Sequence, residues 1–187
     1  MNMEEKLYRE GLEEYSVGWV IGQNIFFLVY FGIGFIGMLP LKIYGFPIIS
    51  VLYALFLIIM FLFILRKHLC THCYYYGKRC STGWGKLSAF MFKKNSGNYK
   101  LGIKLAGITW MLATLIPVIG ILVSLILKFS IFSLVIFILF ILLTPVNFIT
   151  HKKACEKCKM RFICPASMAK GSKDEKIMEF KKEDVQK

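Results

Sequence analysis

The sequence predicts an all-α integral membrane protein with four transmembrane helices, arranged as two hairpins that are each followed by a small cytoplasmic cysteine-rich module. Three observations predict this class. The 187 residues are 57% hydrophobic and have a mean hydropathy of +0.60, which is more apolar than is usual for a soluble domain. Four apolar runs are each about 20 residues long. The six cysteines form two groups that directly follow the second and the fourth run.

The four apolar runs are long enough to cross a bilayer, since about 30 Å of hydrocarbon needs roughly 20 helical residues. They cover residues 17–39, 47–65, 105–127 and 131–150. Backbone groups in lipid must bond within their own segment, so we expect helices. The connections 40–46 and 128–130 are short, which predicts antiparallel hairpins. Gly32, Gly34 and Gly37 predict a close approach between the first helix and a neighbour.

Lysine and arginine set the orientation. The N-terminal segment carries two of them, segment 66–104 carries nine and the tail after Thr150 carries eleven, whereas the other side holds only Lys42 and Lys128. Cytoplasmic loops are enriched in these residues. We therefore expect a multi-pass protein of the cell membrane with both termini cytoplasmic. Its parts are a cytoplasmic segment 1–16, hairpin 17–65, a cysteine-rich basic loop 66–104, hairpin 105–150 and a cysteine-rich basic tail 151–187.

The carboxylates are distributed unevenly. Five glutamates precede Tyr15, the other six acids lie at or after Glu156, and residues 15–155 contain none. Without an ionisable group in the spans, a proton-coupled or cation-coupled transporter is not expected. The acidic N-terminal stretch is either a short interfacial helix or a partner of the basic loops. The tail 173–187 mixes both signs of charge, which predicts a solvated helix or a disordered segment.

The cysteines follow two similar patterns. The first cysteine cluster, Cys70, Cys73 and Cys80, has the spacing C-x2-C-x6-C. The second cysteine cluster, Cys155, Cys158 and Cys164, has the spacing C-x2-C-x5-C. On the reducing cytoplasmic side, metal binding or thiol chemistry is favoured over disulfides.

Each cluster has ligands suited to zinc. A C-x2-C turn brings two thiolates to one ion, a third cysteine folds back, and tetrahedral zinc needs one ligand more. That ligand is His68 or His72 in the first cluster and His151 in the second. The predicted metal ligands are Cys70, Cys73, Cys80, Cys155, Cys158, Cys164, His68 and His151. In the alternative arrangement, Cys70, Cys73, Cys155 and Cys158 share one ion.

An iron-sulfur cluster is the alternative cofactor. Cysteine thiolates also bind such clusters, and Cys164 precedes Pro165 as the last ligand precedes proline in bacterial ferredoxins. The C-x2-C-x2-C run of those ferredoxins is absent, however, and three cysteines leave each cubane one ligand short. Zinc is therefore the preferred metal.

A strip of aromatic and basic residues follows the first cluster. The residues predicted to meet a membrane surface or an anionic ligand are Lys78, Arg79, Trp84, Lys86, Lys93 and Lys94. Tyr and Trp gather at membrane interfaces, where lysine and arginine meet anionic headgroups. Stacking on nucleic-acid bases is the alternative, and we favour the lipid bilayer. There is no Walker motif or H-E-x-x-H, so no reaction is predicted.

Three classes of function remain. The leading one is an accessory or anchoring subunit, without enzymatic activity, that docks a protein partner at the membrane surface. The second is an iron-sulfur subunit that transfers electrons. The third is a four-helix membrane thiol oxidoreductase, because C-x2-C pairs at helix ends resemble the architecture of the vitamin K epoxide reductase type. The charge bias places the thiols on the opposite side from that family, so no residue roles are carried over from it.

Overall fold

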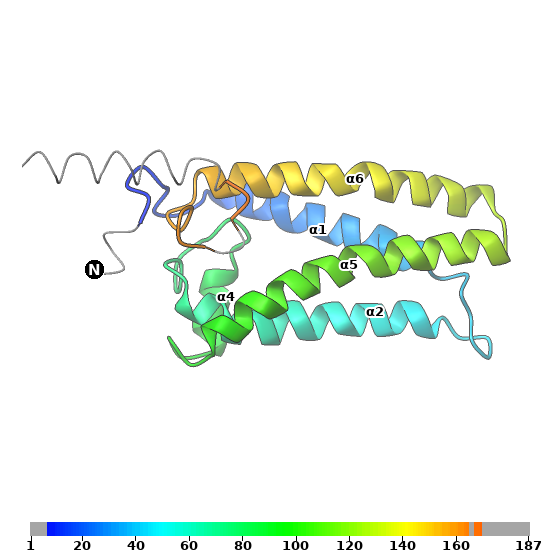
Figure 1. Cartoon of the computed structure of the whole chain (residues 1–187), viewed down its shortest axis with the longest axis horizontal. Coiled ribbons are helices and arrows are strands. Elements are labelled where there is room, and N and C mark those ends of the chain that lie inside the picture. Colours follow the sequence, from blue (N-terminus) through cyan, green and yellow to red (C-terminus); the bar gives the residue numbers. More distant parts are fainter. Residues whose placement is uncertain (1–6, 165–166, 170–187) are drawn as a thin grey trace, which may run out of the picture. The chain divides into compact units, whose positions relative to one another are not determined.

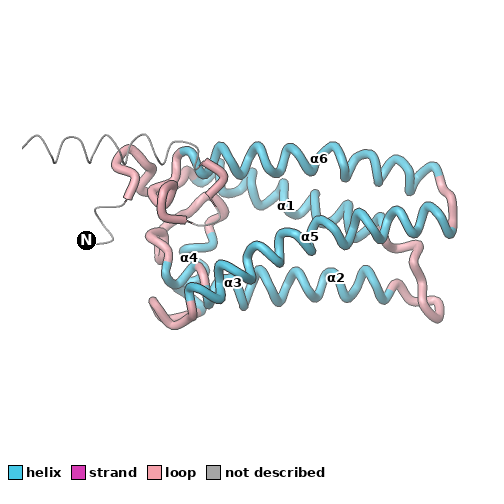
Figure 2. Tube along the Cα trace, in the orientation of Figure 1, coloured by secondary structure: helices cyan, strands magenta, loops and turns pink. Residues whose placement is uncertain are grey.

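In the computed structural model the described residues, 7–164 and 167–169, contain helices and loops and no strand (Figures 1 and 2). Four helical stretches are long and apolar enough to cross a membrane, Val17–Gly37, Ile48–His72, Tyr99–Leu127 and Ile131–Glu156, which confirms the predicted all-helical membrane class. The elements are α1 (Val17–Gly37), α2 (Ile48–Ile58), the π-helix η2 (Ile59–Ile64), α3 (Leu65–His68), the 3-10 helix η3 (Cys70–His72), α4 (Trp84–Met91), α5 (Tyr99–Leu127) and α6 (Ile131–Glu156). The second of the four stretches combines α2, η2, α3 and η3.

The chain divides into two compact units. The larger unit is Glu14–Asn147, and the smaller unit combines Met1–Glu13 with Phe148–Lys187. Residues 131–147 of α6 belong to the larger unit and the rest of α6 to the smaller one. The expectation for the tail 173–187 lies outside the described residues.

Side-chain caps set the helix starts. The Ser16 hydroxyl accepts a hydrogen bond from the Trp19 N–H at 3.3 Å and begins α1. Asn98 caps α5 in the same way, through the Leu101 N–H at 3.1 Å, so α5 starts at Tyr99 rather than at the predicted residue 105. The last helix continues to Glu156, beyond the predicted end at Thr150.

The core of the larger unit is built around Tyr30, which is fully buried. Its ring stacks on Phe140 with the ring centroids 4.7 Å apart, and its hydroxyl lies 3.2 Å from that of Thr144. The Tyr53 hydroxyl donates to the Ala113 carbonyl at 2.8 Å. These contacts join α1 to α6 and α2 to α5, and both tyrosine hydroxyls have a partner, as a low-dielectric interior favours.

Two of the predicted small residues allow close helix packing. A Cβ at Gly34 would lie 3.0 Å from the ring of Pro117, and one at Gly37 would lie 2.6 Å from Ile121, both on α5. The expectation for these two glycines is therefore confirmed. A Cβ at Gly32 would meet nothing within 4 Å, so that glycine does not contribute.

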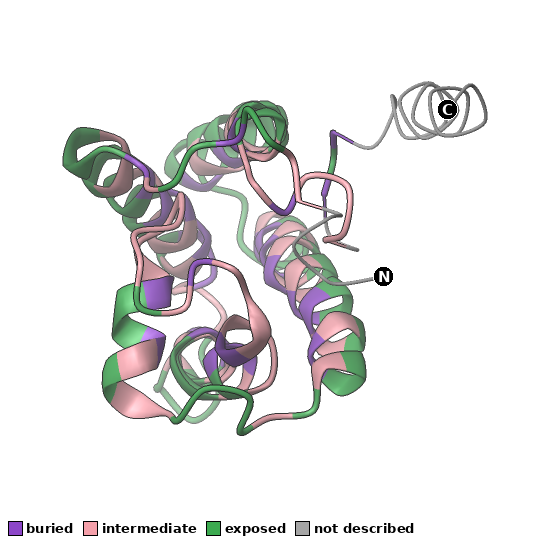
Figure 3. Cartoon of the chain, turned by 90° about the vertical axis from the view of Figure 1, so that its left-hand side faces the viewer, coloured by how far each residue is buried: buried purple, intermediate pink, exposed green. Residues whose placement is uncertain are grey.

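The outer surfaces of the long helices are apolar. Only 22–28% of the most apolar window in each of the four is buried inside the protein. Exposed positions, green in Figure 3, occur on each of these helices. Leu28 and Ile126 are among the most exposed, with exposed fractions of 76% and 75%. So much exposed apolar surface would be costly in water, and a bilayer is the solvent that suits it.

Candidate functional site

The first cysteine cluster lies in the α3–α5 segment, residues 69–98. Cys70 opens η3, and the Cys73 N–H donates to the Cys70 carbonyl at 3.2 Å, so these two cysteines share one tight turn as predicted. The Cys80 sulfur lies 3.3 Å from the Thr82 hydroxyl. All six cysteines of the chain are half-buried thiols rather than disulfides.

The α3–α5 segment has its own buried framework. Thr71 and Ser88 are fully buried, and their hydroxyls donate to the carbonyls of Lys67 and Arg66 at 2.6 and 3.2 Å. Gly85 is also buried, and its carbonyl accepts the Gly77 N–H at 3.0 Å. Satisfied buried hydrogen bonds of this kind hold a loop in one conformation, so the cluster sits on a rigid support.

Arg66 is a functional candidate that sequence reasoning missed. Its side chain is buried, with its Nε donating to the Phe61 carbonyl at 3.0 Å and its guanidinium 5.0 Å from the centre of the Trp84 ring. Its Nη1 has no hydrogen-bond partner among the described residues. The guanidinium interacts electrostatically with the thiols of Cys70 and Cys80, so it can offset negative charge there. In the sequence, Arg66 was only one of the basic residues that were counted to predict the membrane orientation.

The hydrogen bonds of His68 and His72 indicate which of the two imidazoles is better placed to bind a metal ion. The Asn98 N–H donates to His68 Nδ1 at 3.0 Å, so the proton of a neutral His68 is on Nε2 and neither nitrogen has a lone pair left over. His72 Nε2 lies 2.8 Å from the Gly97 carbonyl and must donate to it, which leaves Nδ1 with a lone pair. A bond to a backbone carbonyl is what usually orients a metal-bound imidazole. The geometry therefore favours His72, whereas the sequence favoured His68.

The second cysteine cluster lies in the smaller unit. His151 and Cys155 are one turn apart on α6, with Nε2 3.6 Å from the sulfur. The Cys155 sulfur also accepts hydrogen bonds from the Ser167 hydroxyl and the Met168 N–H, and neither partner was predicted from the sequence. The Cys158 N–H donates to the Cys155 carbonyl at 3.2 Å, which forms the second predicted C-x2-C turn.

The N-terminal stretch pairs with basic residues next to this cluster. The N–H groups of Tyr8 and Leu12 donate to the carbonyls of Lys159 and Lys157, each at 2.9 Å. The Glu13 carboxylate lies 2.8 Å from the Lys159 ammonium. Residues 7–15 form no helix, so pairing with the basic loops is the correct one of the two alternatives for these residues.

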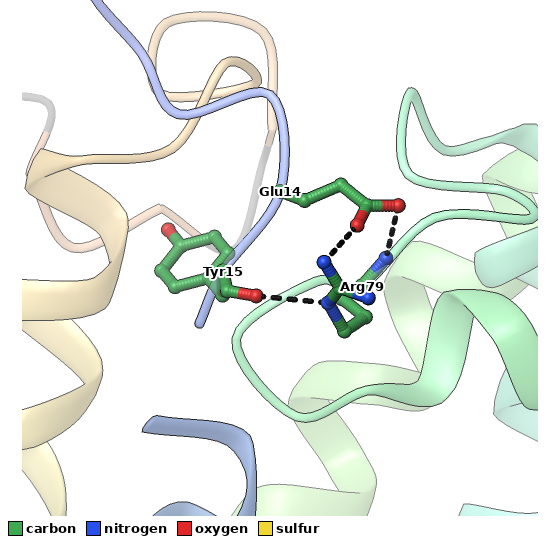
Figure 4. Close-up of polar contacts among 3 residues, drawn as sticks. All are labelled: Glu14, Tyr15 and Arg79. Carbon is green, nitrogen blue, oxygen red and sulfur yellow. Dashed lines mark hydrogen bonds and ion pairs between the residues drawn. The ribbon is translucent and has the colours of Figure 1, made fainter. Parts of the chain in front are cut away.

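Glu14 and Tyr15 make the matching contacts within the larger unit (Figure 4). The Glu14 carboxylate lies 2.5 Å from Nη2 of Arg79, and the Tyr15 carbonyl accepts from Nε of Arg79 at 3.1 Å. The Tyr15 ring is buried 5.8 Å from that of Tyr75. Arg79 therefore anchors the chain before α1, and its charge is used within the protein.

The predicted metal ligands are only partly gathered. Within residues 7–164 and 167–169, no three of the His, Cys, Asp and Glu side chains are placed together so that they could hold a metal ion. The structure does bring together Cys70 with Cys73 and Cys155 with Cys158, each pair on one turn, and His151 with Cys155 on one helix face.

The predicted anion-binding residues fall into two sets. Arg79 pairs with Glu14, Trp84 lies over Arg66, and the Lys78 ammonium donates to the Tyr74 hydroxyl at 3.0 Å. Arg79, Trp84 and Lys78 therefore make contacts within the protein. The others are exposed on or just after α4, next to apolar side chains that the sequence analysis did not single out. This surface, the α4 patch, consists of Lys86, Leu87, Phe90, Lys93 and Lys94.

Comparisons with protein-family models, with curated proteins and with solved structures found no match.

Proposed function

We propose that this protein is an accessory or anchoring subunit of a membrane complex, and that it docks a protein partner through the α4 patch. The observation that supports this is the Phe90 side chain, which is 88% exposed on a helix held by buried hydrogen bonds. Large exposed apolar side chains with a polar rim mark interaction sites. A rigid support lowers the cost of ordering the surface on binding.

The charge around Phe90 indicates what kind of partner fits. Glu14 is the single carboxylate of the larger unit, and it pairs with Arg79. Lys86, Lys93 and Lys94 therefore have no acidic side chain to meet within that unit. A protein segment that presents carboxylates around an apolar pocket is the complementary surface.

Removing the apolar part of the patch tests this proposal. We expect Leu87→Ser with Phe90→Ser to dissociate the complex that the wild-type protein forms, measured as a shift to the size of the isolated protein on native gels. The matched control is Phe46→Ser with Phe129→Ser, whose side chains are 71% and 73% exposed at other loops. Exposed substitutions usually change stability by less than about 0.5 kcal/mol, so both variants should fold. An intact complex in the first variant would contradict partner docking and would assign the patch to the membrane surface.

The proposal includes a topology of two hairpins with both termini and both cysteine clusters in the cytoplasm. Its support is the count of lysine and arginine, nine in residues 66–104 and eleven after Thr150. We expect Cys80 to be protected from a membrane-impermeant maleimide in intact cells and labelled after permeabilisation. Labelling in intact cells would reverse the orientation.

We further propose that the cysteine clusters bind zinc, with an iron-sulfur cluster as the alternative. Thiolates and the Nδ1 lone pair of His72 are donors that suit such an ion, and the positive charge of Arg66 would offset the negative charge of the thiolates. When bound, zinc would cross-link the loop that carries the α4 patch. The described side chains do not form a complete ligand set, so the metal enters no further step of the proposal.

Metal analysis of the purified protein tests this part. We expect one or two equivalents of zinc per chain and a colourless preparation. His72→Ala should lower the zinc content, because it removes the better oriented imidazole, while His68→Ala should leave it unchanged. A brown preparation that contains iron and acid-labile sulfide would contradict zinc and support an iron-sulfur cluster. Purified protein without any metal would contradict both cofactor proposals, and it would not affect the docking proposal.

A further inference from the structure

The strongest unassigned feature is a pocket in the larger unit, lined by residues from the loop after α1, the start of α2 and the end of α5. These three segments lie at one end of the long helices (Figure 1). The pocket has a volume of about 290 Å³ and apolar walls that include Ile43, Ile49, Val123 and Leu127. Drug-sized ligands occupy roughly 300–1,000 Å³, so this volume suits one small headgroup and the first carbons that follow it.

Two lysines line this apolar pocket. Lys42 and Lys128 both border it, and they are the two cations that the sequence places between the paired helices. Residues 15–155 contain no carboxylate, so no acidic side chain from the segments that build the pocket can neutralise them. Two ammonium groups beside an apolar wall are complementary to an anion that carries a hydrocarbon chain.

A buried serine also lines this pocket. Ser124 lines it and is 1% exposed, and its hydroxyl oxygen has no hydrogen-bond partner in the described part of the chain. Leaving a buried hydroxyl without a partner costs about 1–3 kcal/mol. A ligand oxygen in the pocket would remove that cost, so the site presents a donor as well as positive charge.

Residues around the pocket are typical of the headgroup level of a bilayer. Tyr44 and Gly45 have φ values of 52° and 84°, and Ile43 and Phe46 exchange backbone hydrogen bonds of 2.9 and 3.1 Å, which makes a tight hairpin turn. This turn fixes the backbone beside Lys42. It also holds Tyr44 and Phe46 outward, with exposed fractions of 96% and 71%. Tyrosine at such a position belongs to the aromatic belt of a membrane interface.

We propose that this pocket binds one anionic phospholipid. The phosphate lies between the ammonium groups of Lys42 and Lys128, a phosphate or ester oxygen accepts from Ser124, and the first acyl carbons cover Ile49 and Leu127. The α4 patch takes no part in this site, so the site stands independently of partner docking.

Lipid titration of the detergent-purified full chain, read by native mass spectrometry, tests the site. We expect the first phosphatidylglycerol to bind at least tenfold more tightly than the second and at least tenfold more tightly than phosphatidylcholine. Lys42→Gln with Lys128→Gln should abolish this preference. The matched control, Lys93→Gln with Lys94→Gln, removes two exposed lysines of the α4 patch and should keep it.

Ser124→Leu is the second variant, since it fills the pocket without changing the charge. It should also lose the tight lipid, while its thermal midpoint in detergent shows that it still folds. Inorganic phosphate is the other probe, and it should compete with the lipid only weakly because it lacks a chain. Tight lipid binding that survives both the double lysine variant and Ser124→Leu would overturn the proposal. Binding of phosphate without any preference for phosphatidylglycerol would overturn it as well.

Discussion

Replacing Gly85 by alanine is expected to unfold the α3–α5 segment. Gly85 is buried at the start of α4, and a Cβ there would overlap the carbonyl oxygens of Tyr75 and Lys78. These are backbone atoms, which cannot rotate away as a side chain can. Overpacking usually costs 1–3 kcal/mol, and we expect about 3 kcal/mol or more at this position. The measurement is the rate at which a maleimide modifies Cys73 and Cys80 in detergent, which should rise at least tenfold.

Gly107→Ala is the matched control for that substitution. Gly107 lies within α5, and a Cβ there would meet nothing within 4 Å. Alanine is the better helix former by about 1 kcal/mol, so labelling should stay as slow as in the wild type. If Gly85→Ala also labelled at the wild-type rate, the close packing of α4 against residues 75–78 would be wrong.

The second large effect is expected at Tyr30. Its ring is fully buried against Phe140, so Tyr30→Ala removes an aromatic ring from the centre of the larger unit. Aromatic-to-alanine changes in cores cost about 3–5 kcal/mol. Tyr30→Phe keeps the ring and loses only the hydroxyl, with its hydrogen bonds to Thr114 and Thr144, and each such bond is worth about 0.6 kcal/mol in a membrane bundle. Unfolding in SDS mixed with a mild detergent measures both costs.

A substitution elsewhere on α1 separates packing from helix propensity. Leu28 is 76% exposed, so Leu28→Ala should leave unfolding in detergent close to that of the wild type. A Tyr30→Ala protein as stable as Leu28→Ala would show that α1 does not pack on α6 through this ring.

Hydropathy was enough to predict the four long helices because lipid imposes one strong rule on every span. Each predicted run coincides with one candidate span to within two residues or lies inside it, and the first and third runs end at or near their predicted residues, at Gly37 and Leu127. The start of α5 was predicted less well. Asn98 begins α5 in a polar stretch that hydropathy does not recognise.

The loop structure was beyond the sequence because its contacts are specific rather than periodic. Burial of Arg66 depends on the Phe61 carbonyl and the Trp84 ring, a pairing that composition cannot reveal. Cysteine spacing predicted the two C-x2-C turns. It did not predict the orientation of the histidines, since the bonds to Gly97 and Asn98 come from residues about 25–30 positions away.

The smaller unit joins segments that are made at different times during translation. Tyr8 and Leu12 bond to Lys159 and Lys157, which are added about 150 residues later. At roughly 5–20 residues per second, the ribosome needs on the order of 10–30 s to reach them. Throughout that interval the backbone donors of residues 8 and 12 must be bonded to water. The earliest of the described residues are thus among the last to reach their native contacts, and a nascent chain stalled within α6 would still present them to the solvent.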